Sequence, residues 1–402
     1  MLGCASQSGA RMTLILSNDD VEKLLTMPEC IDVMEEAYIE LAEGRGISRT
    51  RSDCFAPTTR PDALYSLKSM DGVVPKLGVG AVRINSDIIT WPKRGNNMRR
   101  EKVPAAPNNR YVGLVLLFSV ETGEPLAILP DGVMQRIRVG AANGLGIRYL
   151  ARKNARTVGI LGSGWQAGAQ LTAACAVRDV ETIRCFSPNP ENRDTFAATM
   201  SALLGVRVDP VAEPEAAIKG ADIVMCASNS IDHIFFERWI EPGMHLSSIK
   251  RPEIEVKAIK RADRVIIHWN DPAPIHVAAK GVVIEEKVEG RGWQLAEEIR
   301  LQAACDLAGA RDRPGRRAQI RRRRHVFHQQ YRARLPVRRG RRSRLPQGQG
   351  EWPRPRGADR LVHRGRASMK SPLRYRTCLL AQLACLSRAR CCLRRSSSSA
   401  RR

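Results

Sequence analysis

Positive charge is confined to one end of this chain, which limits how much of it can form an ordinary folded core. Residues 305–402 hold 28 Arg and one Lys against four acidic residues, and the formal net charge of the whole chain is +25. The residues before position 305 are therefore neutral overall. A range of this length is sufficient for an enzyme-sized body with its own core.

The basic C-terminal range has two interpretations. Its arginine runs at 321–324 and 338–342 are typical of a nucleic-acid-binding arm, because guanidinium groups bind phosphate and release its counterions. However, the range contains almost no Lys and has no hydrophobic periodicity, which is what a GC-rich gene encodes when it is read out of frame. We therefore expect a disordered, Arg-rich tail over 305–402 that results from a frameshift and has no specific nucleic-acid partner.

Cysteine spacing and apolar runs bear on where the protein works. The six cysteines before residue 305 lack the paired spacing of zinc sites or of a disulfide framework. No apolar run approaches the ~20 residues that cross a bilayer, and the first residues lack the order of a secretory signal. We expect a cytoplasmic protein with reduced, mostly buried thiols, no metal site and no membrane partner.

Residues 1–130 predict an α+β domain. Cap-competent residues at 17–20 precede a short periodic helix, and a second helix follows Pro28 and ends at Gly44. Strands are predicted at 64–70, 77–84 and 112–119, and a hairpin turn at 121–125 leads into a further strand. Asp131 is then expected to cap a long helix that ends at Leu150.

From residue 157 the pattern changes to strands that alternate with helices. Strands are predicted at 157–161, 182–186, 223–227, 244–248 and 264–268, with helical stretches between the earlier ones. Such alternation implies right-handed crossovers and a doubly wound parallel sheet. We therefore predict an α/β protein with a Rossmann-like domain at 131–304.

A glycine-rich turn follows the first strand of this predicted sheet and leads directly into a helix. Its pattern is G-x-G-x-x-A, in which the first glycine permits the tight turn, the second lets backbone approach a diphosphate and the alanine keeps the helix close to the strand. In this context the motif predicts dinucleotide binding. The turn residues that we expect to contact the cofactor are Gly162, Ser163, Gly164, Trp165, Gln166 and Ala167.

The residues after the second strand bear on the choice between NAD(H) and NADP(H). NAD enzymes usually place an acidic residue there, on the ribose 2′-hydroxyl, and this chain has none. Ser187, Asn189 and Arg193 are suited to a 2′-phosphate, so we expect NADP(H) rather than NAD(H). Alternatively, Ser187 only begins the next turn and the preference stays open. Ser228, after a later strand, is a further candidate cofactor-binding residue.

Several segments together carry a resemblance to a known family. Residues 112–118, 121–127 and 136–142, together with the Gly162 turn, closely resemble the ornithine cyclodeaminase/mu-crystallin family, and 148–152 and 241–245 match as well. The similarity covers residues 17–305. It implies that the N-terminal domain binds substrate and dimerises, and that returning C-terminal helices complete it. A homodimer is expected if those helices are intact.

The C-terminal range departs from this resemblance. Family members carry a phrase such as Phe-Ile-Asn-Asn-Ile-Gly, then Gly-Leu-Gly and an aromatic-Gln-Phe-Ala-Ala segment. Read one base later, codons for residues 327–339 can spell Phe-Ile-Asn-Asn-Ile-Gly-Leu-Gly-Phe-Gln-Phe-Ala-Ala. This is the specific reason for expecting a frameshift.

The resemblance also implies substrates that are amino acids, or the related imines and 2-oxo acids, with a carboxylate held by cations. It assigns this role to Arg138, to Lys76 on a preceding strand and to Arg51 or Arg49 on the first strand. Arginine suits the role because it binds carboxylates through two hydrogen bonds. Alternatively, Lys76 and Arg51 are solvated strand positions. Lys68 is a further candidate catalytic group, as are Lys76 and Arg138.

One departure limits the predicted chemistry. Cyclodeaminases have an aspartate shortly after the strand that here spans 244–248, whereas this chain has no aspartate there and instead carries Lys250, which favours anion binding, and Glu253. We therefore predict an NAD(P)-dependent oxidoreductase that transfers hydride at the Cα of an amino acid or its imine, such as a ketimine reductase or an amino-acid dehydrogenase. The alternatives are ornithine cyclodeaminase, a non-catalytic NADPH-binding protein like mu-crystallin, and a chain inactivated by loss of its C-terminal helices.

Overall fold

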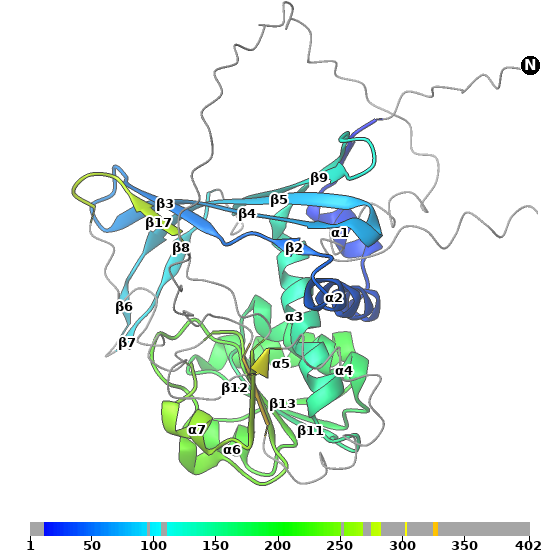
Figure 1. Cartoon of the computed structure of the whole chain (residues 1–402). Helices are drawn as coiled ribbons and strands as arrows, with labels where there is room; N and C mark the ends of the chain where they lie inside the picture. The colour runs from blue at the N-terminus through cyan, green and yellow to red at the C-terminus, as the bar shows by residue number, and fades with distance from the viewer. Residues whose placement is uncertain are drawn as a thin grey trace, which may run out of the picture.

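The structure, a computed structural model, describes residues 12–94, 97–105, 111–250, 253–267 and 275–282, and the backbone of 302–303 and 325–328. These residues form two bodies, each built around a sheet, and helix α3 (Asp131–Leu150) runs from one body to the other (Figure 1). Of the predicted Arg-rich tail, the structure describes only the short strand at 325–328. The prediction that the tail is disordered concerns residues outside the described ones.

The first body contains a nine-stranded, mostly antiparallel sheet. Its order is β1-β10-β9-β5-β4-β3-β17, with β2 paired to β4 and β8 paired to β5. The strands are β1 (Leu14–Ile15), β2 (Ile47–Ser48), β3 (Ser52–Pro57), β4 (Ala63–Val74), β5 (Val79–Thr90), β8 (Glu101–Val103), β9 (Val112–Ser119), β10 (Pro125–Pro130) and β17 (Ile275–Ala278). A separate ribbon pairs β6 (Lys93–Arg94) with β7 (Asn97–Met98).

Two capped helices cover one end of this sheet. Helix α1 (Asn18–Leu24) begins after Ser17, and α2 (Met27–Ala42) begins after Thr26. Each cap is a capping box, in which the hydroxyl accepts from a backbone N–H and an acidic side chain three residues on bonds back to the cap. The predicted helices are therefore present, and each begins at its own cap.

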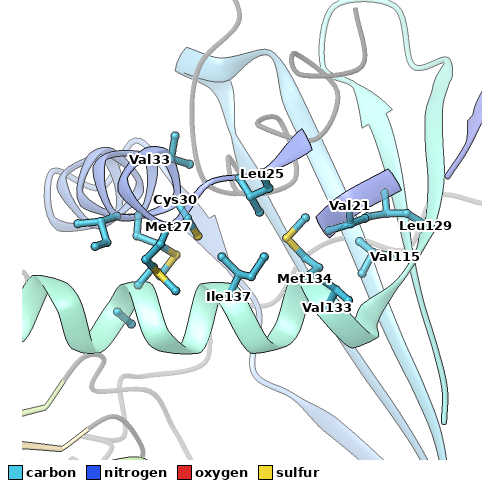
Figure 2. Packing of buried hydrophobic residues seen from close by; sticks show 14 of the residues in the cluster. Val21, Leu25, Met27, Cys30, Val33, Val115, Leu129, Val133, Met134 and Ile137 are labelled. Atoms are coloured by element: carbon cyan, nitrogen blue, oxygen red, sulfur yellow. The ribbon is translucent and has the colours of Figure 1, made fainter. Parts of the chain in front are cut away.

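The core of the first body lies between these helices, α3 and the sheet. Figure 2 shows Met134 and Ile137 of α3 facing Leu25, which follows α1, and Cys30 of α2, while Val115 lies on the adjoining strand β9. All of these side chains are buried. Because one face of α3 belongs to this core, the helix holds its other residues at a fixed position between the two bodies.

The second body is a parallel, eight-stranded sheet with the order β13-β12-β11-β14-β15-β19-β16-β18. Its strands are β11 (Thr157–Leu161), β12 (Thr182–Phe186), β13 (Val208–Pro210), β14 (Ile223–Cys226), β15 (His245–Ser248), β16 (Arg264–Ile267), β18 (Gln302–Ala303) and β19 (His325–His328). The helices are α4 (Trp165–Val177), α5 (Pro190–Leu204), α6 (Pro214–Ile218) and α7 (Val256–Arg261). This confirms the predicted α/β, Rossmann-like architecture.

The structure differs from the sequence prediction at a few elements. Strand β17 lies in the range 131–304 yet pairs with β3 in the first sheet, and β19 pairs with β15 and β16 although we expected no regular structure there. Helix α4 begins at Trp165, so the last residues of the predicted turn motif already belong to the helix. The domain boundaries themselves stay predictions.

The expectation that Asp131 caps α3 is wrong. It is the first residue of α3 and not its cap, because Pro130 occupies the cap position, and the N–H of Val133 in the first turn donates instead to Oδ1 of Asn18 at 3.0 Å. The carboxylate of Asp131 is instead used by residues of the first sheet. Helices of the described residues are all too short or too polar to span a membrane.

Candidate nucleotide and substrate site

The glycine-rich turn has the geometry that a bound dinucleotide requires. Gly162 has φ of +131°, and a Cβ placed there would lie 2.2 Å from the carbonyl oxygen of Ala227. Gly164, by contrast, would meet nothing within 4 Å. Gly162 is therefore required for the turn itself, whereas Gly164 leaves open space at the start of α4, where a diphosphate would approach the backbone N–H groups.

The first residues of α4 surround this opening. Ala167 is fully buried and allows the helix to pack closely on its neighbours, as predicted from the motif. Trp165 is half-exposed, and the guanidinium of Arg136 lies 5.3 Å from the centre of its ring while also pairing with Glu22. The buried Oε1 of Gln166 has no hydrogen-bond partner among the described residues.

The end of β12 carries the predicted 2′-phosphate residues. Ser187 is buried, and Asn189 caps α5, because its Oδ1 accepts from the backbone N–H of Asn192 at 2.9 Å. Nη1 of Arg193 lies 3.5 Å from the carbonyl oxygen of Ser187, so this guanidinium lies beside the strand end. Asn189 is thus occupied locally, and Ser187 and Arg193 are the groups that the structure brings together.

A buried carboxylate joins the carboxyl ends of β14 and β15. Glu253 is fully buried, and its Oε1 accepts from the N–H and hydroxyl of Ser228 at 2.6 and 2.8 Å. Its Oε2 accepts from the hydroxyl of Ser248 at 2.8 Å. Burial raises the pKa of Glu253, although Lys250 and these hydrogen bonds oppose the rise. Ser228, predicted to bind cofactor, is therefore held in place by Glu253.

Lys250 and Lys68 are predicted site residues from the two different bodies. Desolvation lowers the pKa of Lys250 to about 8, with Arg100 and Arg99 contributing, and the attraction of Glu253 opposes this shift. Desolvation lowers the pKa of Lys68 to about 8 too, and Arg100 again contributes. The charge of Arg100 therefore acts on one lysine from each body.

The buried face of the first sheet carries a row of paired charges around Lys68. Its Nζ lies 2.9 Å from Oδ2 of Asp87, whose Oδ1 lies 2.8 Å from Nζ of Lys102. In the neighbouring strand, Nη2 of Arg51 lies 2.6 Å from Oδ2 of Asp53, which is directly opposite Lys68 in the sheet. Arg51 and Lys68 thus belong to one polar face.

Arg138 lies on α3 beside this face. Desolvation and the like charge of Arg83 lower the pKa of its guanidinium to about 10. Within the described residues, Arg138 makes no hydrogen bond or ion pair. The nearby carboxylate of Asp131 accepts two hydrogen bonds from Arg83, at 2.8 and 2.7 Å, and one from Asn85 at 2.9 Å. A desolvated guanidinium in this state is suited to a ligand carboxylate.

Two predicted substrate residues lie apart from these groups. Lys76 is not on a strand but in a single 3-10 turn, Pro75–Leu77, and its Nζ lies 2.8 Å from Oε1 of Glu36 on α2. Arg49, the alternative to Arg51, pairs with Asp71 and is largely exposed. The structure therefore does not bring Lys76 or Arg49 to Lys68, Arg138 and Lys250.

The sequence interpretation missed Arg83, Asn85 and Asp87. They alternate along β5, so they lie on the same face as Lys68, and their register partners confirm this arrangement. A run of alternating charged and polar residues inside an otherwise apolar strand was the available signal. It was hidden because the predicted strand ended at residue 84, whereas β5 continues to Thr90.

These observations define the class of protein. A parallel sheet with a G-x-G-x-x-A turn and an open approach at Gly164 is the architecture of a dinucleotide-binding α/β protein. The described residues contain no cluster of His, Cys, Asp or Glu arranged to hold a metal ion.

Comparison with known proteins gives the family. The model of the ornithine cyclodeaminase/mu-crystallin family matches residues 11–267, and the chain belongs to this family. A Δ1-pyrroline-2-carboxylate reductase of Bacillus cereus is 27% identical over 265 residues, which is 65% of this chain and 76% of that protein. An alanine dehydrogenase of Archaeoglobus fulgidus is 26% identical over 286 residues, which is 69% of this chain and 81% of that protein.

A solved structure agrees with the fold. The Δ1-pyrroline-2-carboxylate reductase of Thermococcus litoralis, in complex with NADH and L-proline, superposes with a TM-score of 0.61 at 23% identity and covers 79% of this chain and 92% of its own. The relatives are thus NAD(P)-dependent oxidoreductases that act on imines and amino acids, as the sequence predicted.

Proposed function

We propose that this protein is an imine reductase or amino-acid dehydrogenase that uses a nicotinamide dinucleotide. The observation that carries the proposal is the desolvated guanidinium of Arg138, which makes no hydrogen bond or ion pair with a carboxylate among the described residues and lies near Arg83 and Asp131. The relatives named above support it, because the matched region includes both the turn and this face.

The residues of this chain then have distinct roles. Arg138 binds the carboxylate of the substrate and orients its Cα, and Arg83 is held beside it by Asp131. Lys68, with a pKa of about 8, donates a proton to the imine nitrogen or accepts one from the amine. The nicotinamide, when bound, supplies or accepts the hydride at Cα.

The preference for NADP(H) belongs to the same proposal. Two features support it: β12 ends at Phe186 without a following acidic residue, and the guanidinium of Arg193 lies beside Ser187 at that strand end. A 2′-phosphate would bind to these groups, whereas an NAD enzyme usually has an acidic residue directly at this strand end for the ribose 2′-hydroxyl.

We further propose that the enzyme works in the cytoplasm as a homodimer through the outer face of the first sheet. Leu67, Val112 and Leu114 on β4 and β9 are each about 40% exposed or more, at 39%, 46% and 44%. An apolar face of this kind is typical of an interface.

The activity is tested by mixing the purified chain with NADPH and with cyclic imines, or with 2-oxo acids plus ammonium, and following NADPH absorbance. We expect oxidation of NADPH that depends on the imine. Formation of proline and ammonia from ornithine without net NADPH oxidation would favour cyclodeamination, and tight cofactor binding without turnover would favour a storage role. Either result would contradict the proposal.

The dimer and the frameshift are tested by comparing the chain as given with one whose reading frame is restored near residue 310. The restored chain should be a dimer by light scattering and have higher turnover, because the returning helices complete the first body. Equal oligomeric state and equal turnover in the two chains would refute the frameshift.

A further inference from the structure

Helices α3 and α4 lie side by side and run in the same direction. A Cβ at Gly140 would lie 2.5 Å from the carbonyl oxygen of Ala169. One helical turn earlier in both helices, the guanidinium of Arg136 lies 5.3 Å from the centre of the Trp165 ring. Because Trp165 is the first residue of α4, this parallel packing places Arg136 beside the start of that helix.

The glycine turn at this point has no basic side chain of its own. Residues 162–168 contain neither Lys nor Arg, and Trp165 is the fourth residue of the G-x-G-x-x-A motif. A dinucleotide brings a negative charge on each phosphate of its diphosphate, whereas a helix N-terminus supplies only about half of a positive charge. Arg136, carried by the neighbouring helix, is a cation in position to supply the remainder.

The contacts of Arg136 hold its guanidinium without saturating it. Both of its hydrogen bonds go to the carboxylate of Glu22 on α1, and both are donated by Nη2, although a guanidinium has further N–H donors. The side chain of Glu22 is half-exposed, and ion pairs open to solvent contribute little free energy. A diphosphate can therefore compete with Glu22 for this guanidinium at small cost.

Arg136 is distinct from the two other arginines that have been given ligands. Arg138 lies two residues further along α3, and residues at this spacing point to different sides of a helix. Arg193 lies beside the end of β12, where its Nη1 is 3.5 Å from the carbonyl oxygen of Ser187. The packing against Trp165 thus directs Arg136 to neither the substrate carboxylate nor the 2′-phosphate.

We propose that Arg136 binds the diphosphate of the nicotinamide dinucleotide, that the ring of Trp165 holds its guanidinium at the turn, and that Glu22 competes with the cofactor for it. The inference rests on the dinucleotide binding of the proposed function and adds a cofactor-binding residue from outside the glycine motif. Since NADPH and NADH share the diphosphate, Arg136 contributes to the binding of both.

Two variants that remove the same ion pair test the proposal, because they should act in opposite directions. Binding of NADPH and of NADH to the full-length chain is measured by isothermal titration calorimetry at constant ionic strength. Arg136→Gln should weaken both by about tenfold, and Arg136→Lys should retain part of the affinity. Glu22→Gln should tighten both by about two- to fivefold, the contribution of an exposed ion pair.

Two further variants serve as controls, and thermal unfolding shows whether each protein is folded. Arg207→Gln should change neither affinity, because its guanidinium is 85% exposed and pairs with Asp209. Arg193→Gln should weaken NADPH and spare NADH, whereas Arg136→Gln should weaken the two equally. A loss confined to NADPH in Arg136→Gln would overturn the diphosphate role.

The remaining outcomes separate this inference from the proposed function. Weaker binding in both Arg136→Gln and Glu22→Gln would show that the ion pair only holds α1 against α3, and would overturn the inference. If the unmodified chain binds both nucleotides and Arg136→Gln binds them equally well, the inference fails and the proposed function stands. If the unmodified chain, folded, binds neither nucleotide, the proposed function fails as well.

Discussion

At the scale of single residues, the site depends on how buried charges are paired. Asp131 accepts two hydrogen bonds from Arg83, whereas Arg138 is influenced by the charge of Asp131 but makes no hydrogen bond or ion pair with it. Removing Asp131 would therefore leave two arginines competing for one substrate carboxylate. The arrangement explains why an acidic residue at the start of α3 is part of the site although it does not face the substrate directly.

Arg138→Gln tests the proposed carboxylate site. Glutamine keeps hydrogen-bonding capacity but lacks the charge, so kcat/KM for imine reduction should fall about 10- to 100-fold, the range expected for a hydrogen bond between charged groups. The KM for NADPH should change little. The comparison variant is Lys76→Gln, since Lys76 pairs with Glu36 away from the site. An unchanged kcat/KM in Arg138→Gln would contradict this role.

The proton donor sets the expected pH dependence. Lys68 and Lys250 both have a pKa lowered to about 8, chiefly by desolvation, so they lose their positive charge as the pH rises through that value. Imine reduction requires the protonated lysine, and kcat/KM should therefore fall above pH about 8. Lys68→Met should abolish this descending limb at low remaining activity. A limb that persists unchanged in Lys68→Met would show that another group titrates, and the exposed Lys219→Met is the control.

At the scale of elements, α3 and α4 meet through glycines. A Cβ at Gly140 would lie 2.5 Å from the carbonyl oxygen of Ala169, so the backbones of the two helices are nearly in contact. Helix α4 begins at the glycine turn and α3 carries Arg138. The close contact therefore sets the position of the proposed carboxylate site relative to the cofactor turn.

Two glycine substitutions separate packing from binding. Gly140→Ala forces α3 and α4 apart and should lower the free energy of unfolding by about 1–3 kcal/mol. Gly164→Ala fits without a clash and should leave stability nearly unchanged, yet it should weaken NADPH binding because its methyl group occupies the approach to α4. Thermal unfolding and NADPH titration measure the two effects. Loss of stability in Gly164→Ala but not in Gly140→Ala would contradict this explanation.

The elements also show where sequence reasoning is sufficient. Strand β11, the glycine turn and α4 could be predicted because a local pattern specifies them, and the capping boxes specify the starts of α1 and α2. Lys76 was predicted on a strand, whereas it lies in the short turn Pro75–Leu77. The prediction was wrong because apolar residues continue on both sides of this turn. Arg83 and Asp131 were missed as a pair because their contact joins residues far apart in the chain, and strand register decides it.

At the scale of the whole molecule, the site exists only because two bodies are joined in three ways. Helix α3 runs from one body to the other, and the backbone of Arg99 forms a bridge with Ser230. Strand β17 follows β16 of the second sheet in the chain, but it pairs with β3 of the first sheet (Figure 1). Such long-range joins are not visible in local sequence patterns. The resemblance to a family predicted that a substrate domain is joined to a Rossmann-like domain. The position of cationic side chains such as Arg83 could be read only from the structure.

The proposed function depends most directly on cofactor binding. Isothermal titration calorimetry of the purified chain with NADPH and with NADH measures it without requiring a known substrate. We expect saturable binding of one NADPH per chain, tighter than NADH, and weaker binding in Gly164→Ala. If soluble, folded protein binds neither nucleotide, the proposed function is wrong.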